Sequence, residues 1–358
     1  KNNIQKQVSL CYKKLSMSRK NLIVLSHKNI ILRDQKILNL YLDFKSKIKK
    51  FKSKKFLVAV SGGADSLTLA AMCKIYQNEY KNKIFYYINI NHNIRRNSFK
   101  ESEKVKKILK KQKILLKIIN NKVKIEKNIQ HLARKARYSI LVKECSRKDC
   151  RNILMGHHKD DQIETFLIRL SRGSGVKGLS SMEMISDVNN NIKVFRPFLE
   201  IEKKVLVYSA KKIFGEYIND PSNKNDKFLR VKIRKILPIL INSGISKDQI
   251  IKSINNLQTS SETLNLYYSD IYKKIVKKNG KKITIQKKNF LSLNKEFQIK
   301  ILGNIFKQLK KTDYPPRAKK IEFLLTRLTR SDFKDYNLAG CLISLKDAVF
   351  VTEKSLKN

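Results

Sequence analysis

The most constraining feature of this 358-residue sequence is a short glycine-rich stretch between two apolar segments, FLVAVSGGADSLTLA at residues 56–70. The residues at 56–60 are apolar and partly β-branched, which predicts a buried strand, and the apolar residues after Leu67 recur at helical spacing. A glycine-rich turn from strand into helix directs backbone N–H groups and the positive helix end at one point, which favours a phosphate site. A plain strand-to-helix turn, with Ser61 or Asp65 capping the helix, explains the same residues.

The pattern around this stretch alternates between short strands and amphipathic helices. This order predicts an α/β domain with a doubly wound parallel sheet, in which ligands bind at the carboxyl ends of the strands. After Asp220 and Pro221 the pattern becomes mostly helical as far as residue 275, and two β-rich runs around Lys346 and Asp347 predict a hairpin near the end. The expected strands are 56–60, 84–90, 114–119 and 152–155, and the expected helices are 65–80, 99–112 and 129–147.

The composition points to a polyanionic partner. The formal net charge is +50, which favours nucleic acid or an anionic membrane surface, although joint enrichment of Lys, Ile and Asn indicates that part of it is coding bias.

The five cysteines form no CxxC pair, which predicts neither a disulfide framework nor a zinc ribbon, and no apolar run is long enough to span a bilayer. The first 33 residues contain no acidic side chain, which is typical of a transit peptide, but Met17 as the true start explains this equally well.

A second stretch contains residues that could act in catalysis or ligand binding: MGHHKDDQIETFLIRLSRGSGVKGLSSM, residues 155–182. Asp161 and Glu164 are three residues apart, so on a helix they share a face and could hold an ammonium group. Two other readings remain open. The acids could simply favour the helix N-terminus, or they could form a metal site with His157 or His158.

The first stretch resembles the pyrophosphate loop of the N-type ATP pyrophosphatases. It is not a Walker A loop, because no Gly-Lys-Ser/Thr follows the glycines. The resemblance implies cleavage of ATP between the α- and β-phosphates and adenylation of a substrate. It also implies ATP contacts from the loop, with Asp65 holding Mg²⁺ because pyrophosphate carries more charge than backbone donors neutralise. The loop residues are Ser61, Gly62, Gly63, Ala64, Asp65 and Ser66.

Seven motifs occur in a fixed order along the sequence: SGGADS, NHNIRRNSFKE at 91–101, ARKARY at 133–138, GHHKDDQIET at 156–165, RGSGVKGLSSM at 172–182, RPFL at 196–199 and DPSNKNDKFLRVKIRKILPIL at 220–240. This set resembles the tRNA(Ile)-lysidine synthetases over roughly residues 51–240. Two positions depart from the family pattern: Val231 replaces a usual asparagine and Asn91 a common aspartate.

The resemblance implies an activity and a set of residue roles. Members use ATP to ligate free lysine to C2 of the cytidine at the first anticodon position of tRNA(Ile) with a CAU anticodon, through an adenylated tRNA. The product, lysidine, changes decoding from AUG to AUA. By the same resemblance, His92 and Arg95 lie near the nucleotide, Asp161 and Glu164 bind lysine, and Arg172 and Gly173 position the adenylate or the base.

The expected organisation follows from both readings. We expect a basic extension at 1–50, an adenine nucleotide alpha hydrolase-like catalytic domain at 51–225, a helical tRNA-binding region at 226–310 and a small α+β domain at 311–358. A homodimer and a cytoplasmic location are expected, or an organelle if residues 1–50 are a transit segment. A tRNA 2-thiolation enzyme of the same superfamily is the alternative, and so is an RNA-binding protein that has lost activity.

Overall fold

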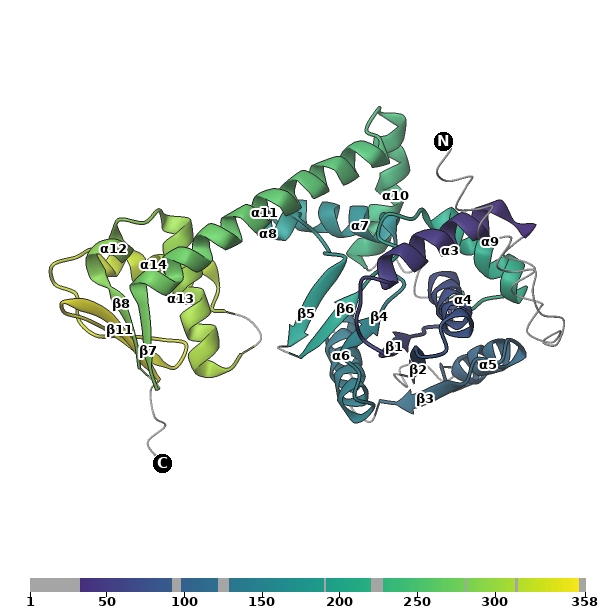
Figure 1. Ribbon diagram of the computed structural model, residues 1–358. Coiled ribbons are helices and arrows are strands. Elements are labelled where there is room, and N and C mark those ends of the chain that lie inside the picture. The colour runs from purple at the N-terminus through teal and green to yellow at the C-terminus, as the bar shows by residue number, and fades with distance from the viewer. Residues whose placement is uncertain are drawn as a thin grey trace. The chain divides into compact units, whose positions relative to one another are not determined.

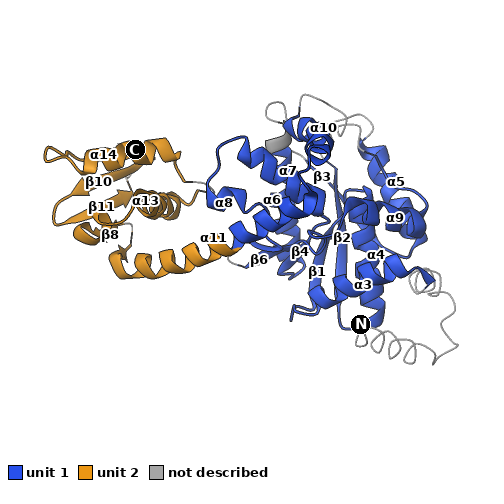
Figure 2. Cartoon of the chain, turned by 90° about the horizontal axis from the view of Figure 1, so that it is seen from above, with its two compact units in different colours: residues 1–258 blue, residues 259–358 orange. Residues whose placement is uncertain are grey.

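The computed structural model describes residues 33–91, 98–121, 129–189, 191–219, 228–280, 282–312 and 315–353. The chain forms two compact units, residues 1–258 and 259–358, which are coloured separately in Figure 2. Among the described helices, none is long and apolar enough to cross a membrane.

The first unit is built on a six-stranded sheet with the strand order β3-β2-β1-β4-β6-β5. The neighbours from β3 to β6 pair in parallel, and β5 pairs with β6 in antiparallel register. The predicted doubly wound sheet is confirmed, and the four predicted strands are present; the edge hairpin of β5 and β6 was not predicted. The strands are β1 (Lys55–Ala59), β2 (Ile84–Asn91), β3 (Leu116–Asn120), β4 (Asn152–Leu154), β5 (Ile185–Asn189) and β6 (Ile192–Phe195).

Helices cover both faces of this sheet (Figure 1). Alternate residues of β1 face opposite ways, so Phe56 and Val58 join the larger core while Leu57 packs against α6 on the other face. The three predicted helices are confirmed as α4 to α6. The helices of the unit are α3 (Gln35–Ile48), α4 (Ala64–Glu79), α5 (Ser98–Lys111), α6 (Ile129–Arg147), α7 (Lys159–Leu170), α8 (Val176–Leu179), α9 (Lys203–Phe214), α10 (Leu229–Asn242) and α11 (Lys247–Ile275), of which α11 continues into the second unit.

The second unit has its own antiparallel sheet, ordered β7-β8-β11-β10-β9, and its own core. The predicted hairpin is confirmed as β10 and β11, which pair in antiparallel register. The elements are β7 (Val276–Asn279), β8 (Lys282–Gln286), α12 (Lys287–Leu291), α13 (Lys295–Lys310), α14 (Ala318–Leu328), β9 (Tyr336–Leu338), β10 (Cys341–Leu345) and β11 (Ala348–Glu353).

Two of the expected domain boundaries fall inside packed cores. Residues of α3, such as Ile37 and Phe44, are fully buried in the core of the first unit, so this helix is not part of a separate extension at 1–50. Strand β8 pairs with β11, and therefore residues on both sides of the expected boundary at 310/311 share one core. Both differences have one cause: apolar residues at 37–48 and 283–309 pack against elements distant in the sequence.

Candidate active site

The glycine-rich loop joins β1 to α4 and is shaped by one side chain. The Ser66 hydroxyl accepts hydrogen bonds from the backbone N–H groups of Ser61 (3.2 Å) and Gly62 (3.0 Å) and donates one to the Gly63 carbonyl (3.0 Å). Ser66 is buried, whereas Ser61 is exposed. The Ser61 hydroxyl also donates to the Ser66 hydroxyl at 3.2 Å, so the Ser66 side chain holds the loop together.

Helix α4 begins without a side-chain cap. Its N-cap residue is Gly63, which makes no side-chain cap hydrogen bond, and neither Ser61 nor Asp65 occupies the N-cap position. The N–H groups of a helical first turn have no partner within the helix and attract anions. The geometry therefore favours the phosphate-binding interpretation of the loop, with Ala64 in its first turn.

Gly62 is required by the conformation and by its neighbours. Its φ is +95°, and a Cβ there would lie 2.3 Å from Val105 Cγ2 on α5. Its carbonyl accepts a hydrogen bond from the Ile218 N–H at 2.9 Å. A side chain at this position would displace the loop from both neighbours.

The second motif lies beside the loop because β4 pairs with β1 in parallel, so their carboxyl ends meet at the same edge of the sheet. Gly156, directly after β4, approaches the start of α4 so closely that a Cβ on it would lie 2.9 Å from the Asp65 carbonyl oxygen. Helix α7 then begins with a capping box, in which His158 Nδ1 accepts from the Asp161 N–H and the Asp161 carboxylate accepts from the His158 N–H.

His158 joins the two motifs, and sequence reasoning had not assigned it this role. Its Nδ1 accepts a backbone hydrogen bond, which assigns the proton to Nε2. Nε2 lies 3.6 Å from Asp65 Oδ2 and 3.5 Å from Asp161 Oδ2. The predicted carboxylates Asp65 and Asp161 are thus brought together around one buried imidazole.

The environment of Asp65 fits a cation. Burial raises the pKa of Asp65, the charge of His158 lowers it, and the charge of Asp161 raises it further, with a net increase. Its Oδ1 is buried and has no hydrogen-bond partner among the described residues. Within the same residues no group of three or more His, Cys, Asp or Glu could hold a metal ion by itself. A cation here would therefore complete its shell with ligand oxygens, as Mg²⁺ does on nucleotides.

Asp161 is kept ionised by its neighbours. Burial alone would raise its pKa, but the neighbouring imidazoles of His158 and His157, the charge of Arg230 and the hydrogen bond from the His158 N–H together lower it. Glu164, one turn further along α7, contacts no loop residue among those described. It lies 2.6 Å from Arg234 Nε and 3.1 Å from Arg230 Nε, both on α10. These arginines occur in the quoted motif at 220–240, but no chemical role was derived for them from the sequence.

The remaining predicted site residues are more distant or undescribed. Arg172 is exposed and follows the end of α7. Gly173 has a φ of +64° and open space around it. His92 and Arg95 lie outside the described residues. Asn91 is buried and its amide donates to Asn120 Oδ1 at 3.1 Å, whereas Val231 is a buried apolar residue of α10.

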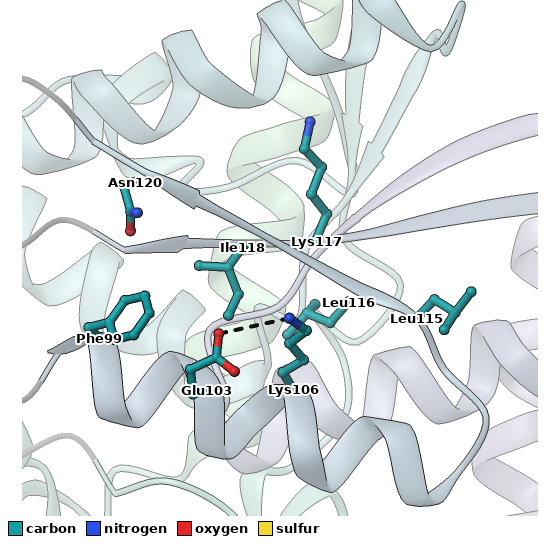
Figure 3. Close-up of a pocket in the computed structure, with 8 residues that line it drawn as sticks. All are labelled: Phe99, Glu103, Lys106, Leu115, Leu116, Lys117, Ile118 and Asn120. Carbon is teal, nitrogen blue, oxygen red and sulfur yellow. Dashed lines mark ion pairs between the residues drawn. The ribbon is translucent and has the colours of Figure 1, made fainter.

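A large surface cavity lies away from this site. It has a volume of about 550 Å³ and lies between β3 and α5, with Phe99 and Leu115 at opposite ends and Glu103 paired with Lys106 (Figure 3). It contains none of the predicted site residues, and the loop geometry rather than cavity size therefore locates the site.

Comparison with known proteins defines the class first. Residues 36–240 match the family model described as a PP-loop domain, which agrees with the loop and strand order. The fold also resembles that of a solved U34-tRNA thiolase from Methanococcus maripaludis, with a TM-score of 0.54 and 21% identity over 62% of this chain and 79% of that one. The chain is thus an ATP-binding PP-loop protein.

Curated relatives identify the family within this class. The tRNA(Ile)-lysidine synthase of Wolbachia pipientis wMel is 32% identical over 297 residues, covering 82% of this chain and 69% of that protein. The enzyme of the same name from Orientia tsutsugamushi (strain Boryong) is 31% identical over 81% of this chain and 67% of that protein. The chain belongs to the tRNA(Ile)-lysidine synthase family, whose members are ATP-dependent ligases.

The close approach at Gly156 leads to a first prediction. A methyl group in Gly156→Ala would press on the Asp65 carbonyl at 2.9 Å and the Ser66 nitrogen at 3.2 Å. We expect ATP to bind about tenfold more weakly or worse, because small misplacements of a binding group are costly. Gly175→Ala, where a Cβ meets nothing within 4 Å, is the control. Equal ATP affinities of the two variants by calorimetry would contradict the prediction.

His157 leads to a second prediction. Burial lowers its pKa to about 3, with the charges of Arg196, Arg134 and Arg230 acting in the same direction and that of Asp161 against it. An unfolded histidine titrates near ~6.5. Between these values the unfolded chain binds a proton that the folded protein does not, so the folded state loses stability as the pH falls below about 6.5. We expect His157 to contribute about 2 kcal/mol to the loss between pH 7 and pH 5.

Urea unfolding of wild type and His157→Gln at pH 7, 6 and 5 measures this contribution. The variant should lose less unfolding free energy than wild type over this range. Parallel losses in the two proteins would show that His157 is accessible to protons in the folded state.

Proposed function

We propose that this protein ligates free lysine to C2 of the cytidine at the first anticodon position of tRNA(Ile), using ATP and releasing AMP and pyrophosphate. Family membership supports the reaction. The observation that carries the assignment to this site is the contact of His158 Nε2 with both Asp65 at 3.6 Å and Asp161 at 3.5 Å. This contact joins the glycine loop to the helix that we propose to bind lysine, which supports one location for both half-reactions.

In the first half-reaction the loop receives the pyrophosphate end of ATP. The cytidine O2 attacks the α-phosphorus, the bond to the β-phosphate oxygen breaks, and pyrophosphate leaves toward the first turn of α4 and the backbone of Ser61, Gly62 and Gly63. Asp65 would hold Mg²⁺, which supplies positive charge for the departing pyrophosphate. His92 and Arg95 are proposed to contact the nucleotide.

In the second half-reaction the side-chain amine of lysine displaces AMP at C2. Free lysine carries an ammonium group with a pKa near ~10.4, so it must bind as a cation and then lose a proton. Asp161 and Glu164 are proposed to bind this cation, and a carboxylate of the pair accepts the proton. Arg172 and Gly173 are proposed to position the adenylate or the target base.

The proposed RNA partner is tRNA(Ile) with a CAU anticodon, and the modification changes its decoding from AUG to AUA. The formal net charge of +50 supports binding to a polyanion. The parts of the chain after residue 226 are proposed as further tRNA-binding regions. A homodimer is proposed from the family resemblance alone.

The cysteine positions argue against a tRNA 2-thiolase. Cys145 and Cys150 are buried beside the start of β4, and the site lies at the opposite, carboxyl end of that strand. Cys73 is buried in the core within α4, and Cys341 lies in the second unit. Among the described cysteines of the first unit, none faces the loop, so none of these three thiols is placed to carry sulfur there.

A single-turnover experiment tests the proposed function. With ATP and tRNA but no lysine, adenylated tRNA should accumulate with release of pyrophosphate, and added lysine should discharge it with release of AMP. Release of ADP would show γ-phosphate chemistry and contradict the proposal. Absence of any adenylated tRNA would contradict the proposed order of steps.

A further inference from the structure

Two arginines pair with Glu164 in this structure. Arg234 donates to both carboxylate oxygens, from Nε to Oε1 at 2.6 Å and from its terminal nitrogen to Oε2 at 3.1 Å. Arg230 Nε lies 3.1 Å from Oε2, and its terminal nitrogen donates to Thr165 Oγ1 at 3.1 Å. The Glu164 side chain is 3% exposed, so solvent does not compete for these bonds. Three of the roughly four acceptor positions of the carboxylate are therefore taken by guanidinium groups.

The pairing of Glu164 with two arginines affects whether a cation can bind there. Two guanidinium groups already face one carboxylate, and an ammonium would be a third positive charge around it. Like charges at contact distance repel strongly where water is excluded. Binding of lysine at Glu164 therefore requires another anion to accept one or both guanidinium groups.

The two arginines are placed to meet such an anion. Their side chains are 37% (Arg230) and 27% (Arg234) exposed, so each remains reachable from solvent while Glu164 is not. Their partner Glu164 lies one turn along α7 from Asp161, and the imidazole of His158 lies 3.5 Å from Asp161 and 3.6 Å from Asp65 of the loop. A phosphate bound at the start of α4 would offer the guanidinium groups bidentate oxygens in exchange for the carboxylate.

We propose that lysine binding at Glu164 is coupled to a bound phosphate group, which takes over Arg234 and Arg230 and releases the carboxylate. This inference rests on the proposed role of Glu164 in binding lysine. Arg234 and Arg230 are then positioning residues that order the reaction: the phosphate ligand binds first and the amine second. The phosphate comes from the nucleotide or from the RNA backbone, and the experiment separates these two sources.

Equilibrium dialysis of radiolabelled lysine against the full-length protein tests the coupling. The arms are protein alone, protein with α,β-methylene-ATP and Mg²⁺, and protein with unmodified tRNA. We expect lysine to bind at least tenfold more tightly in one of the two phosphate-containing arms than to the protein alone. The arm that shows the gain identifies the source of the phosphate.

Variants assign the coupling to these residues. In Arg234→Gln, Arg230 still balances the negative charge of Glu164. The lysine affinity of this variant without phosphate should rise several-fold. The ratio of lysine affinities with and without the phosphate ligand should fall toward one. Arg234→Lys should retain part of the gain. Lys247→Gln is the matched control, because Lys247 also pairs with an α7 carboxylate, Asp160, at 2.5 Å. Its coupling ratio should equal that of wild type.

The outcomes separate the coupling hypothesis from the hypothesis that Glu164 binds lysine. Equal lysine affinity in all arms of the wild type would overturn the coupling. So would a wild-type ratio of lysine affinities with and without phosphate in Arg234→Gln, provided that this variant unfolds at the normal temperature. If that variant unfolds early, Arg230→Gln gives the same comparison. If Glu164→Gln binds lysine as well as wild type in every arm, Glu164 is not a lysine ligand and the proposed function fails at this residue. Absence of lysine binding in every arm overturns both.

Discussion

Replacing Asp65 by asparagine is expected to lower tRNA-dependent ATP–pyrophosphate exchange by at least about a hundredfold, the loss typical of removing one group that stabilises transition-state charge. The reason is local. Asp65 Oδ1 is a buried acceptor with no partner among the described residues, which fits a role in holding a cation for the departing pyrophosphate. An amide keeps the shape of the side chain and removes its charge, so tRNA affinity should stay close to that of wild type.

Asp149→Asn is the control for this measurement, because Asp149 is 85% exposed and precedes β4 at the opposite edge of the sheet from the loop. Its exchange rate should match that of wild type. Normal exchange in Asp65→Asn would remove this carboxylate from the adenylation step.

Glu164→Gln is expected to raise the KM for lysine strongly while leaving adenylation nearly intact. Removing one partner of a desolvated charged pair costs about 2–5 kcal/mol, which corresponds to a change of roughly thirtyfold or more. The variant also leaves Arg230 and Arg234 without their carboxylate, so we expect a lower melting temperature. The rate of lysine-dependent discharge of pre-adenylated tRNA separates the effect on lysine from the effect on stability.

A metal-binding role for Glu164 predicts the opposite order of losses. Adenylation would then fail first, and additional Mg²⁺ would partly restore it. Asp160→Asn is the matched control, since Asp160 lies on the same helix and pairs with Lys247. Its lysine KM should change by less than about twofold, as expected of a peripheral ion pair.

The sequence predicted the parts of the fold that depend on local pattern. The strands at 56–60 and 84–90 and the helices around them were found within one or two residues, because their apolar periodicity and glycine boundaries are strong. The burial of α3 could not be predicted, since Phe44 packs against Tyr76 of α4 and against Phe198, both distant from it in the sequence. Strand β8 was missed for a related reason: five residues, KITIQ, become a strand by pairing with β11, more than sixty residues later.

The local motifs of the site were predicted from the sequence, but the contacts between them were not. The glycine loop and the carboxylates of α7 are local motifs whose chemistry can be derived from residue type and spacing. The contact between them depends on the strand order, which places β4 beside β1 although β2 and β3 lie between them in the sequence. The pairing of Glu164 with Arg234 joins residues seventy positions apart. Without an alignment, no local signal indicates such a pair.

The internal hydrogen bonds of the glycine loop affect how nucleotide binding responds to temperature. Ser66 fixes the backbone of Ser61, Gly62 and Gly63 through three hydrogen bonds that need no ligand. The entropy lost in ordering this segment is therefore spent during folding, and little remains to be lost when ATP binds. A preorganised receptor of this kind should bind ATP with a small entropic penalty, whereas Ser66→Ala should show a larger one at similar enthalpy in calorimetric titrations.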